Sequence, residues 1–155
     1  MNYSNADLPR KRVGATALFL NPRREILIVK PAYRDGWLTP GGTVNENETP
    51  MEGCAREVSE ELGLNCEIGR LLGLGYRSRH GDKVENIQFV FWGAVLLPSD
   101  ESAITLQREE LTEYRFSPVE ELGQHLNQHL ANRFKLAYEA HESGHVFYEE
   151  NMRLS

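Results

Sequence analysis

The stretch 41–64 constrains the fold more than any other part of the chain, because its second half carries signals for both ends of a helix. Thr49 and Pro50 suit the N-cap and the first helical position, and Glu52 completes a capping box with Thr49. Gly63 stands where helices end in a left-handed residue. The apolar residues between these ends recur on one side of the predicted helix: Met51, Cys54, Ala55, Val58 and Leu62. This stripe predicts that one face of the helix packs on the core.

Three carboxylates conflict with this otherwise regular pattern. Glu57, Glu60 and Glu61 stand at i, i+3 and i+4, so they share one face of the helix. They also crowd its last turn, where the helix dipole favours cations. Like charges at this spacing cost about 0.2–0.5 kcal/mol a pair, and Arg56, four residues before Glu60, is the helix residue placed to compensate. A hard divalent cation with oxygen ligands, such as Mg²⁺, would resolve the conflict.

The same carboxylates also fit a plain solvated helix face, which is the common role of glutamate runs. The loop before the helix favours a binding site instead. Pro40 is followed by Gly41 and Gly42, which let the backbone pass close to a ligand. A strand, a glycine-rich turn and a helix with carboxylates form a unit that can hold a metal and a phosphate together.

This stretch resembles the signature of the Nudix hydrolase family, G-x5-E-x7-R-E-U-x-E-E-x-G-U, in which U is bulky and apolar. The residues that fill its fixed positions are Gly42, Glu48, Arg56, Glu57, Val58, Glu60, Glu61, Gly63 and Leu64. Two softer preferences of the family are missed, since Asn45 replaces a common Glu and Asn47 a common Gly. Asn47 tolerates a left-handed turn and is expected to preserve the loop, whereas Asn45 removes an accessory acid and leaves the subfamily open.

The resemblance implies a reaction and a set of roles. Family members hydrolyse a nucleoside diphosphate linked to another group, and they require Mg²⁺ or Mn²⁺. The metal ligands implied are the carbonyl of Gly42 and the carboxylates of Glu57, Glu60 and Glu61. By resemblance Arg56 orients a carboxylate and Glu48 fixes Arg56. We therefore expect Arg56, Glu57 and Glu60 to serve the reaction as catalytic residues.

The base that activates water remains open between the helix and a loop. If the metal takes all three helix carboxylates, the base is one of them or an acid from elsewhere. Glu110 stands at the end of a polar loop, six residues before Phe116, and some family members place a loop acid at a similar distance before an aromatic residue. We expect Glu110 to act as an additional ligand or as the base. Glu109 is its rival, and a solvated loop charge is the alternative for both.

Composition bounds the class of protein. The length of 155 residues fits a single domain, residues 1–155. The net charge of −6 disfavours broad binding to nucleic acid or anionic membranes. Cys54 and Cys66 are too few for a disulfide framework or a zinc cluster, and Cys54 is expected as a reduced core residue. The first residues show no apolar signal region, and no apolar run is long enough to span a membrane, so a cytoplasmic protein is expected.

The remaining pattern alternates strands and helices. Strands are expected at 13–20, 25–30, 64–76, 87–97 and 114–116, and helices after Ser117 and over 130–141, the latter ended by Gly144. Glycines inside 64–76 indicate a bulge or a close backbone approach. This order gives the α/β class with a mixed sheet between helices. The resemblance makes it the Nudix α/β/α sandwich.

Residues that flank the signature are candidates for substrate binding. Lys30, Arg34 and Trp37 are placed to line a pocket beside the metal, and an aromatic ring from Tyr33, Trp37 or Tyr76 is expected to stack on a base. For Trp37 a core anchor is the favoured alternative. His141 continues the apolar face of the last helix and is expected to pack there.

The substrate itself is not determined by these residues. A small-molecule nucleotide is expected, with nucleoside triphosphates, sugar nucleotides and dinucleoside polyphosphates all open. By resemblance, the ADP-ribose subfamily tends to carry a proline some way after the signature; this chain has none between Pro50 and Pro98, which disfavours ADP-ribose. A non-catalytic nucleotide sensor of the same fold is the alternative function, and a homodimer is an open arrangement.

Overall fold

The structure is a computed structural model, and it describes residues 4–151. Its strands are β1 (Arg12–Leu20), β2 (Ile26–Pro31), β3 (Gly41–Thr43), β4 (Leu71–Arg77), β5 (Asn86–Val95), β6 (Leu111–Ser117) and β7 (Phe147–Asn151). Its helices are α1 (Pro50–Leu62), α2 (Pro98–Ser102) and α3 (Gln128–Ser143), with short 3₁₀ turns η1 (Asn5–Asp7) and η2 (Val119–Gln124).

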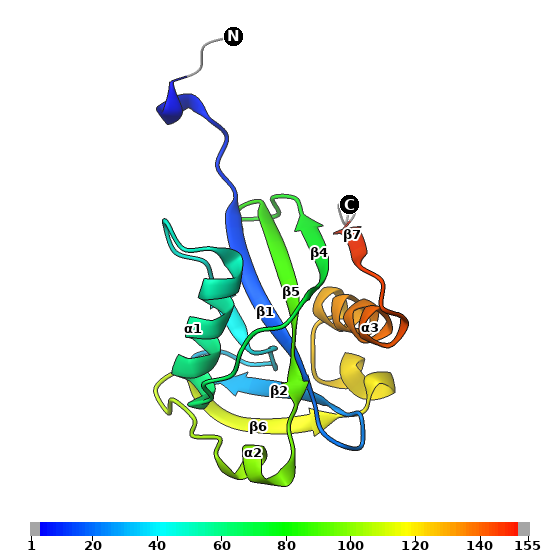
Figure 1. Ribbon diagram of the computed structural model, residues 1–155. Coiled ribbons are helices and arrows are strands. Elements are labelled where there is room, and N and C mark those ends of the chain that lie inside the picture. The colour runs from blue at the N-terminus through cyan, green and yellow to red at the C-terminus, as the bar shows by residue number, and fades with distance from the viewer. Residues whose placement is uncertain (1–3, 152–155) are drawn as a thin grey trace.

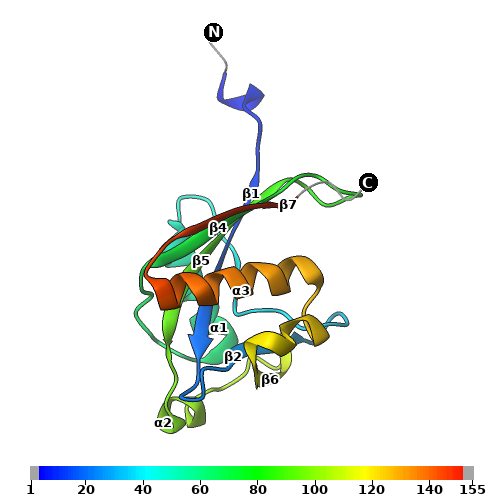
Figure 2. The same cartoon turned by 90° about the vertical axis from the view of Figure 1, so that its right-hand side faces the viewer.

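The strands form one mixed sheet between two helices. The strand order is β6-β2-β1-β5-β4-β7, and β3 pairs with β1 beside β2. The pairs β1–β5 and β4–β7 are parallel, and the other neighbours are antiparallel. α1 covers one face of the sheet and α3 the other (Figures 1 and 2). This is the α/β class with a mixed sheet that the sequence predicted.

β1 supplies both halves of the core because side chains alternate along a strand. Ala15, Ala17 and Phe19 are buried on the α1 side. Leu18 and Leu20 are buried on the α3 side, against the apolar residues of that helix. The buried positions of β1 are therefore nearly continuous along the strand. β1 also pairs with β3, which contains Gly41 and Gly42.

The expected strand 64–76 is shorter in the structure, since β4 begins only at Leu71. The bulge expected from its glycines is present, because the pairing with β5 shifts between Leu71 and Gly73. A Cβ atom at Gly73 would lie 2.1 Å from the ring of Phe147. The glycine therefore makes room for β7, which adds to the sheet as a parallel strand beside β4.

Two further expectations are corrected. The helix expected after Ser117 is the short 3₁₀ turn η2, and the regular helix starts only at Gln128. The sequence places Met51 on the buried stripe, but Met51 is 44% exposed, whereas Cys54, Val58 and Leu62 of the same stripe are fully buried. None of the helices within residues 4–151 has the length and apolar character that crossing a bilayer requires.

Candidate active site

The N-cap and the left-handed end of α1 are those that its sequence predicts, although only the Thr49 half of the expected capping box is present. The Thr49 hydroxyl accepts a hydrogen bond from the Glu52 amide at 3.1 Å, and Gly63 ends the helix at φ 67°. The apolar residues Cys54, Val58 and Leu62 are fully buried against the sheet. These contacts set the rotation of α1, so its acidic face turns towards β3 and the loop before the helix.

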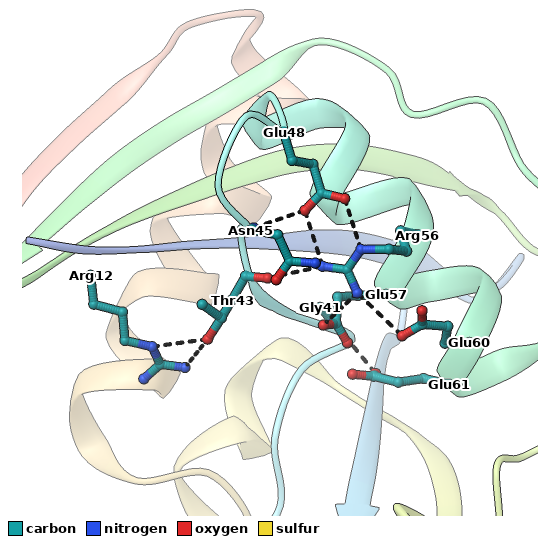
Figure 3. Close-up of polar contacts among 9 residues, drawn as sticks. All are labelled: Arg12, Gly41, Thr43, Asn45, Glu48, Arg56, Glu57, Glu60 and Glu61. Carbon is teal, nitrogen blue, oxygen red and sulfur yellow. Dashed lines mark hydrogen bonds and ion pairs between the residues drawn. The ribbon is translucent and has the colours of Figure 1, made fainter.

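Arg56 is the centre of a cluster of carboxylates. Its Nε and Nη2 donate to the two Glu48 oxygens at 2.7 and 3.0 Å, a bidentate pair. Its Nη1 donates to Glu57 at 3.1 Å and to Glu60 at 3.2 Å. Nη2 also reaches the Thr43 carbonyl at 3.0 Å. As Figure 3 shows, Arg56 thus ties α1 to β3 and orients two of the three helix carboxylates.

The loop between β3 and α1 supports this cluster. The Asn45 amide donates to Glu48 at 2.9 Å, and Asn47 has the left-handed φ of 60° expected for it. The hydrogen bonds from Arg56 and from Asn45 lower the pKa of Glu48. Glu48 therefore stays charged and holds Arg56 in place, which is the arrangement that the family resemblance implied.

Glu61 has a different environment from its neighbours. It is only 7% exposed, and its Oε2 accepts a hydrogen bond from the Gly41 amide at 3.3 Å. Burial raises the pKa of Glu61 to about 9; the Gly41 amide opposes this, while the charges of Glu57 and Glu110 add to it. None of the ion pairs of the described residues reaches Glu61. This carboxyl is buried without a cation.

β3 lets the carboxylates approach the backbone closely. A Cβ atom at Gly42 would lie 2.6 Å from Cδ of Glu57, so the carboxyl group of Glu57 packs directly on this glycine. At Gly41 the φ of 137° is one that side chains disfavour, and a Cβ atom would lie 2.3 Å from the Ala15 carbonyl. Gly42 is therefore required by the carboxylate site, and Gly41 is required by the close packing of β3 on β1.

The segment 103–110, which carries the loop acid expected at the site, is bound to the end of α1 by backbone contacts that the sequence did not reveal. The Thr105 amide donates to the Leu62 carbonyl at 2.9 Å, and the Gln107 amide donates to the Glu61 carbonyl at 3.0 Å. These bonds satisfy carbonyls at the end of α1 that lack helical partners. They bring Glu110 near enough for its charge to contribute to the raised pKa of Glu61.

The donors at this place suit a hard cation but do not form a complete site by themselves. In the part of the chain that the structure describes, no three carboxylate, imidazole or thiol side chains gather closely enough to hold a metal. Glu57 and Glu61 do lie close enough for Glu57 to contribute to the raised pKa of Glu61, and both stand beside the backbone of Gly41 and Gly42. Because all these donors are oxygens and one carboxyl is buried without a cation, the residues fit Mg²⁺ or Mn²⁺.

The candidates for substrate binding are scattered. Lys30 lies on β2 and pairs with Glu113 of β6 at 3.7 Å. The hydroxyl of Tyr76 donates to Glu85 at 2.8 Å. Arg34 lies in the loop after β2 and lines a groove of about 520 Å³ together with Tyr33, Gly41 and Gly42.

Two aromatic contacts bear on the packing alternatives weighed from the sequence. Trp37 packs against the apolar cluster under α3, with the Arg115 guanidinium 4.9 Å from its ring. This is the core contact favoured for Trp37. His141 stacks on Trp92 with ring centroids 3.8 Å apart, which confirms its packing position. Cys54 is a free, buried thiol, as expected.

The comparisons with known proteins agree with this geometry. The family model described as NUDIX domain matches residues 10–138. Diphosphoinositol polyphosphate phosphohydrolase 3-alpha of Mus musculus is 33% identical over 101 residues, which cover 64% of this chain and 61% of that protein. A putative 8-oxo-dGTP diphosphatase of Bacillus subtilis (strain 168) is 33% identical over 82 residues, 53% of this chain and 52% of that protein. The chain thus spans roughly half of each relative's length.

The fold has solved counterparts as well. The structure of a MutT protein from Methanosarcina mazei Go1 aligns with a TM-score of 0.70 at 24% identity, and the alignment covers 89% of this chain and 99% of that one. Such identity shows the shared fold alone. Together with the family match over residues 10–138, it establishes that the chain belongs to the Nudix hydrolase family.

Proposed function

We propose that the protein is a divalent-metal-dependent hydrolase of a diphosphate bond in a nucleoside diphosphate linked to another group, with a nucleoside triphosphate or related nucleotide as substrate. The observation that carries the proposal is the carboxyl pair of Glu57 and Glu61 against the two glycines of β3, Gly41 and Gly42. Because these carboxyl groups lie against the backbone, carboxylate and carbonyl oxygens are available together to a cation. The relatives' names, a diphosphatase and a polyphosphate phosphohydrolase, support the reaction class.

In this proposal the metal ligands are Glu57, Glu60, Glu61 and the carbonyl of Gly42. These residues would hold Mg²⁺ or Mn²⁺, which would supply positive charge for the diphosphate and would make a water molecule more acidic. Arg56 fixes the directions of Glu57 and Glu60, because it donates to both carboxylates at once. Glu61 has no contact with Arg56, and its carboxyl group is oriented by the hydrogen bond from the Gly41 amide.

The proton of the attacking water needs an acceptor within this arrangement. Glu110 is our candidate, since it is exposed, stands on the segment bound to the end of α1, and acts on Glu61 through its charge. A loop acid can move towards the phosphorus when substrate binds. Glu109 is the neighbouring alternative, and the two are separable by mutation.

A nucleotide sensor without catalysis is the second function that this fold supports. It would need the same groove but not the Arg56 cluster with its full set of carboxylates. The complete signature therefore favours the hydrolase.

The test is a panel of nucleoside triphosphates, sugar nucleotides and dinucleoside polyphosphates with Mg²⁺, followed by phosphate and pyrophosphate release. Glu57→Gln serves as the matched inactive variant. Turnover that requires the metal and disappears in this variant supports the proposal. Binding of a panel member with no turnover in the wild-type protein would instead favour the sensor.

A further inference from the structure

The outer edge of β6 is open in this fold. β6 is the last strand on one side of the sheet, and β2 is its one neighbour among the described strands (Figure 1). Val29 of β2 exchanges hydrogen bonds with Leu38 at 2.7 and 2.8 Å, so its amide and carbonyl point away from β6. Val29 is also the ladder partner of Tyr114. Because the two residues of such a pair direct their backbone groups to opposite sides, the amide and carbonyl of Tyr114 point out of the sheet.

The outward backbone groups of β6 lack partners at its centre. Phe116 has the same orientation as Tyr114, because backbone direction alternates along a strand. In the described part of the chain, no hydrogen bond reaches the outward groups of these two residues. The Thr112 carbonyl accepts a hydrogen bond at 3.0 Å from Arg108, an exposed side chain that can move aside. An edge with unpaired amides and carbonyls can add another strand.

The edge carries one acid and one base on the same face. Glu113 and Arg115 are two residues apart, so both side chains point to the α3 side, and both are exposed. The Arg115 guanidinium lies 4.9 Å from the ring of Trp37 on that side. Within residues 4–151 Arg115 forms no ion pair, and Glu113 reaches only Lys30, at 3.7 Å. Both charges are therefore available to a partner at the edge.

This arrangement is complementary to itself about a two-fold axis at Tyr114. In an antiparallel pair of β6 strands with this axis, Glu113 lies opposite Arg115 of the other copy, and the reciprocal contact forms as well. The outward groups of the two Tyr114 residues bond to one another, and each Phe116 amide faces the Thr112 carbonyl of the other copy. The charged pairs are then of the non-hydrogen-bonded kind, in which facing side chains lie closest.

Charge also disfavours the neighbouring registers. An axis at Glu113 would set this acid opposite its own copy, and an axis at Arg115 would do the same with the base. Like charges directly opposite one another destabilise a strand pair. The axis at Tyr114 is thus favoured by the charges and is compatible with the outward hydrogen-bonding groups.

The opposite edge of the sheet does not have this property. β7 has the sequence Phe-Tyr-Glu-Glu-Asn, with adjacent acids at Glu149 and Glu150 and no base. Two copies of β7 would bring like charges together. Self-complementarity therefore distinguishes β6 from β7, and it points to a second copy of this chain as the partner of β6.

We propose that two copies of the protein associate through β6, so that one sheet continues across the dimer. The proposal concerns a surface outside the carboxylate site and does not depend on the hydrolase function. Because the contact is one strand pair and not a broad apolar surface, we expect a dissociation constant on the order of 1–100 µM.

Sedimentation equilibrium at about 5–500 µM protein tests the charged pairs. Glu113→Arg gives an edge with two bases and Arg115→Glu an edge with two acids. Each variant alone is expected to dimerise about tenfold or more weakly than wild type, because both cross-strand pairs become repulsive. An equal mixture of the two variants restores opposite charges in both pairs, so a heterodimer of near-wild-type affinity is expected. The controls Glu139→Arg and Arg23→Glu make the same changes at exposed positions away from β6 and should change the dissociation constant by less than about twofold.

Amide hydrogen exchange of the wild-type protein tests the edge itself and needs no variant to fold. We expect exchange at the Tyr114 and Phe116 amides to slow by roughly threefold or more between the lowest and highest concentrations. The Arg115 amide, which faces β2, is expected to be protected throughout. Unchanged exchange at Tyr114 and Phe116 would overturn the proposal.

The sedimentation results can overturn it in three further ways. A wild-type protein that stays monomeric at about 500 µM would leave no dimer to explain. A dimer that persists equally in Glu113→Arg and Arg115→Glu would use another surface. Two monomeric variants that form no heterodimer on mixing would refute the pairing of Glu113 with Arg115.

Discussion

Replacement of Glu61 by glutamine tests whether this carboxyl is kept for a cation or for the fold. Burial raises the pKa of Glu61 to about 9, well above its ordinary value of 4.5. The folded, metal-free protein therefore holds a proton at this site that the unfolded chain releases as the pH rises past 4.5. Glutamine keeps the shape of the side chain and its oxygen acceptor for the Gly41 amide, but it does not titrate.

The sign and size of the effect follow from linkage. Between pH 4.5 and 9 the folded state binds more protons than the unfolded state, so its stability is highest at the acid end and falls as the pH rises, by ~1.4 kcal/mol per pH unit. By pH 7 the loss is about 3 kcal/mol, a large share of the 5–15 kcal/mol that holds a typical domain together. This loss is absent in Glu61→Gln, which is therefore expected to be the more stable protein near neutral pH without metal.

Urea unfolding in EDTA at pH 5, 6, 7 and 8 measures this difference directly. The stability gap between Glu61→Gln and wild type is expected to widen by about 1.4 kcal/mol with each pH unit. Glu52→Gln is the control, since it makes the same change at an exposed site on the same helix, and its curve should run parallel to wild type. Saturating Mg²⁺ should then stabilise the wild type more than Glu61→Gln. Parallel curves for Glu61→Gln and wild type in EDTA would refute the reasoning.

Three more outcomes follow from the site. Glu57→Gln should lower kcat by about two orders of magnitude or more while the thermal midpoint in EDTA stays near wild type; near-wild-type turnover at saturating Mg²⁺ would remove Glu57 from the site. Glu110→Gln should lower kcat by roughly 10²–10⁴-fold and Glu109→Gln only slightly, so a loss confined to Glu109 would transfer the role by one residue. Tyr33→Ala should raise KM for a nucleotide with little change in stability, whereas Trp37→Leu should cost about 1–3 kcal/mol of stability; the reverse pattern in urea unfolding and steady-state kinetics would move base stacking to Trp37.

The parts of the site that could be predicted from the sequence are those set by local signals. The N-cap at Thr49, the left-handed end at Gly63 and the left-handed turn at Asn47 all follow from backbone preferences of single residues, and the structure has each of them. The pairing of Arg56 with Glu60 follows in the same way from helical spacing. Such features need no knowledge of what the chain packs against.

The features that could not be predicted depend on long-range contacts. Glu110 was expected at the site from the family resemblance, but the contacts of its segment were not predictable, because residues 103–110 have no strong periodicity and their amides satisfy carbonyls at the end of α1. Met51 was misplaced because helical spacing gives a direction around the axis but not how far along the helix the core extends. The groove that Arg34 lines could not be predicted for a similar reason. Its lining residues, which include Arg12 and Arg133, are far apart in the sequence and come together only when the sheet and α3 form.

The three helix carboxylates predicted to repel one another have different partners in the structure: Glu57 and Glu60 contact Arg56, and Glu61 does not. Arg56 donates hydrogen bonds to Glu57 and Glu60 from within the protein and so holds their carboxyl groups in fixed directions. Glu61, the most buried of the three, receives only the neutral Gly41 amide and lies beside Glu57. A fold selected for stability alone would place an apolar or paired residue at this position, because a buried carboxyl without a cation is costly. The protein therefore gives Glu57 and Glu60 a cationic partner, Arg56, but gives Glu61 none. A divalent cation that prefers oxygen ligands would provide the positive charge that Glu61 lacks.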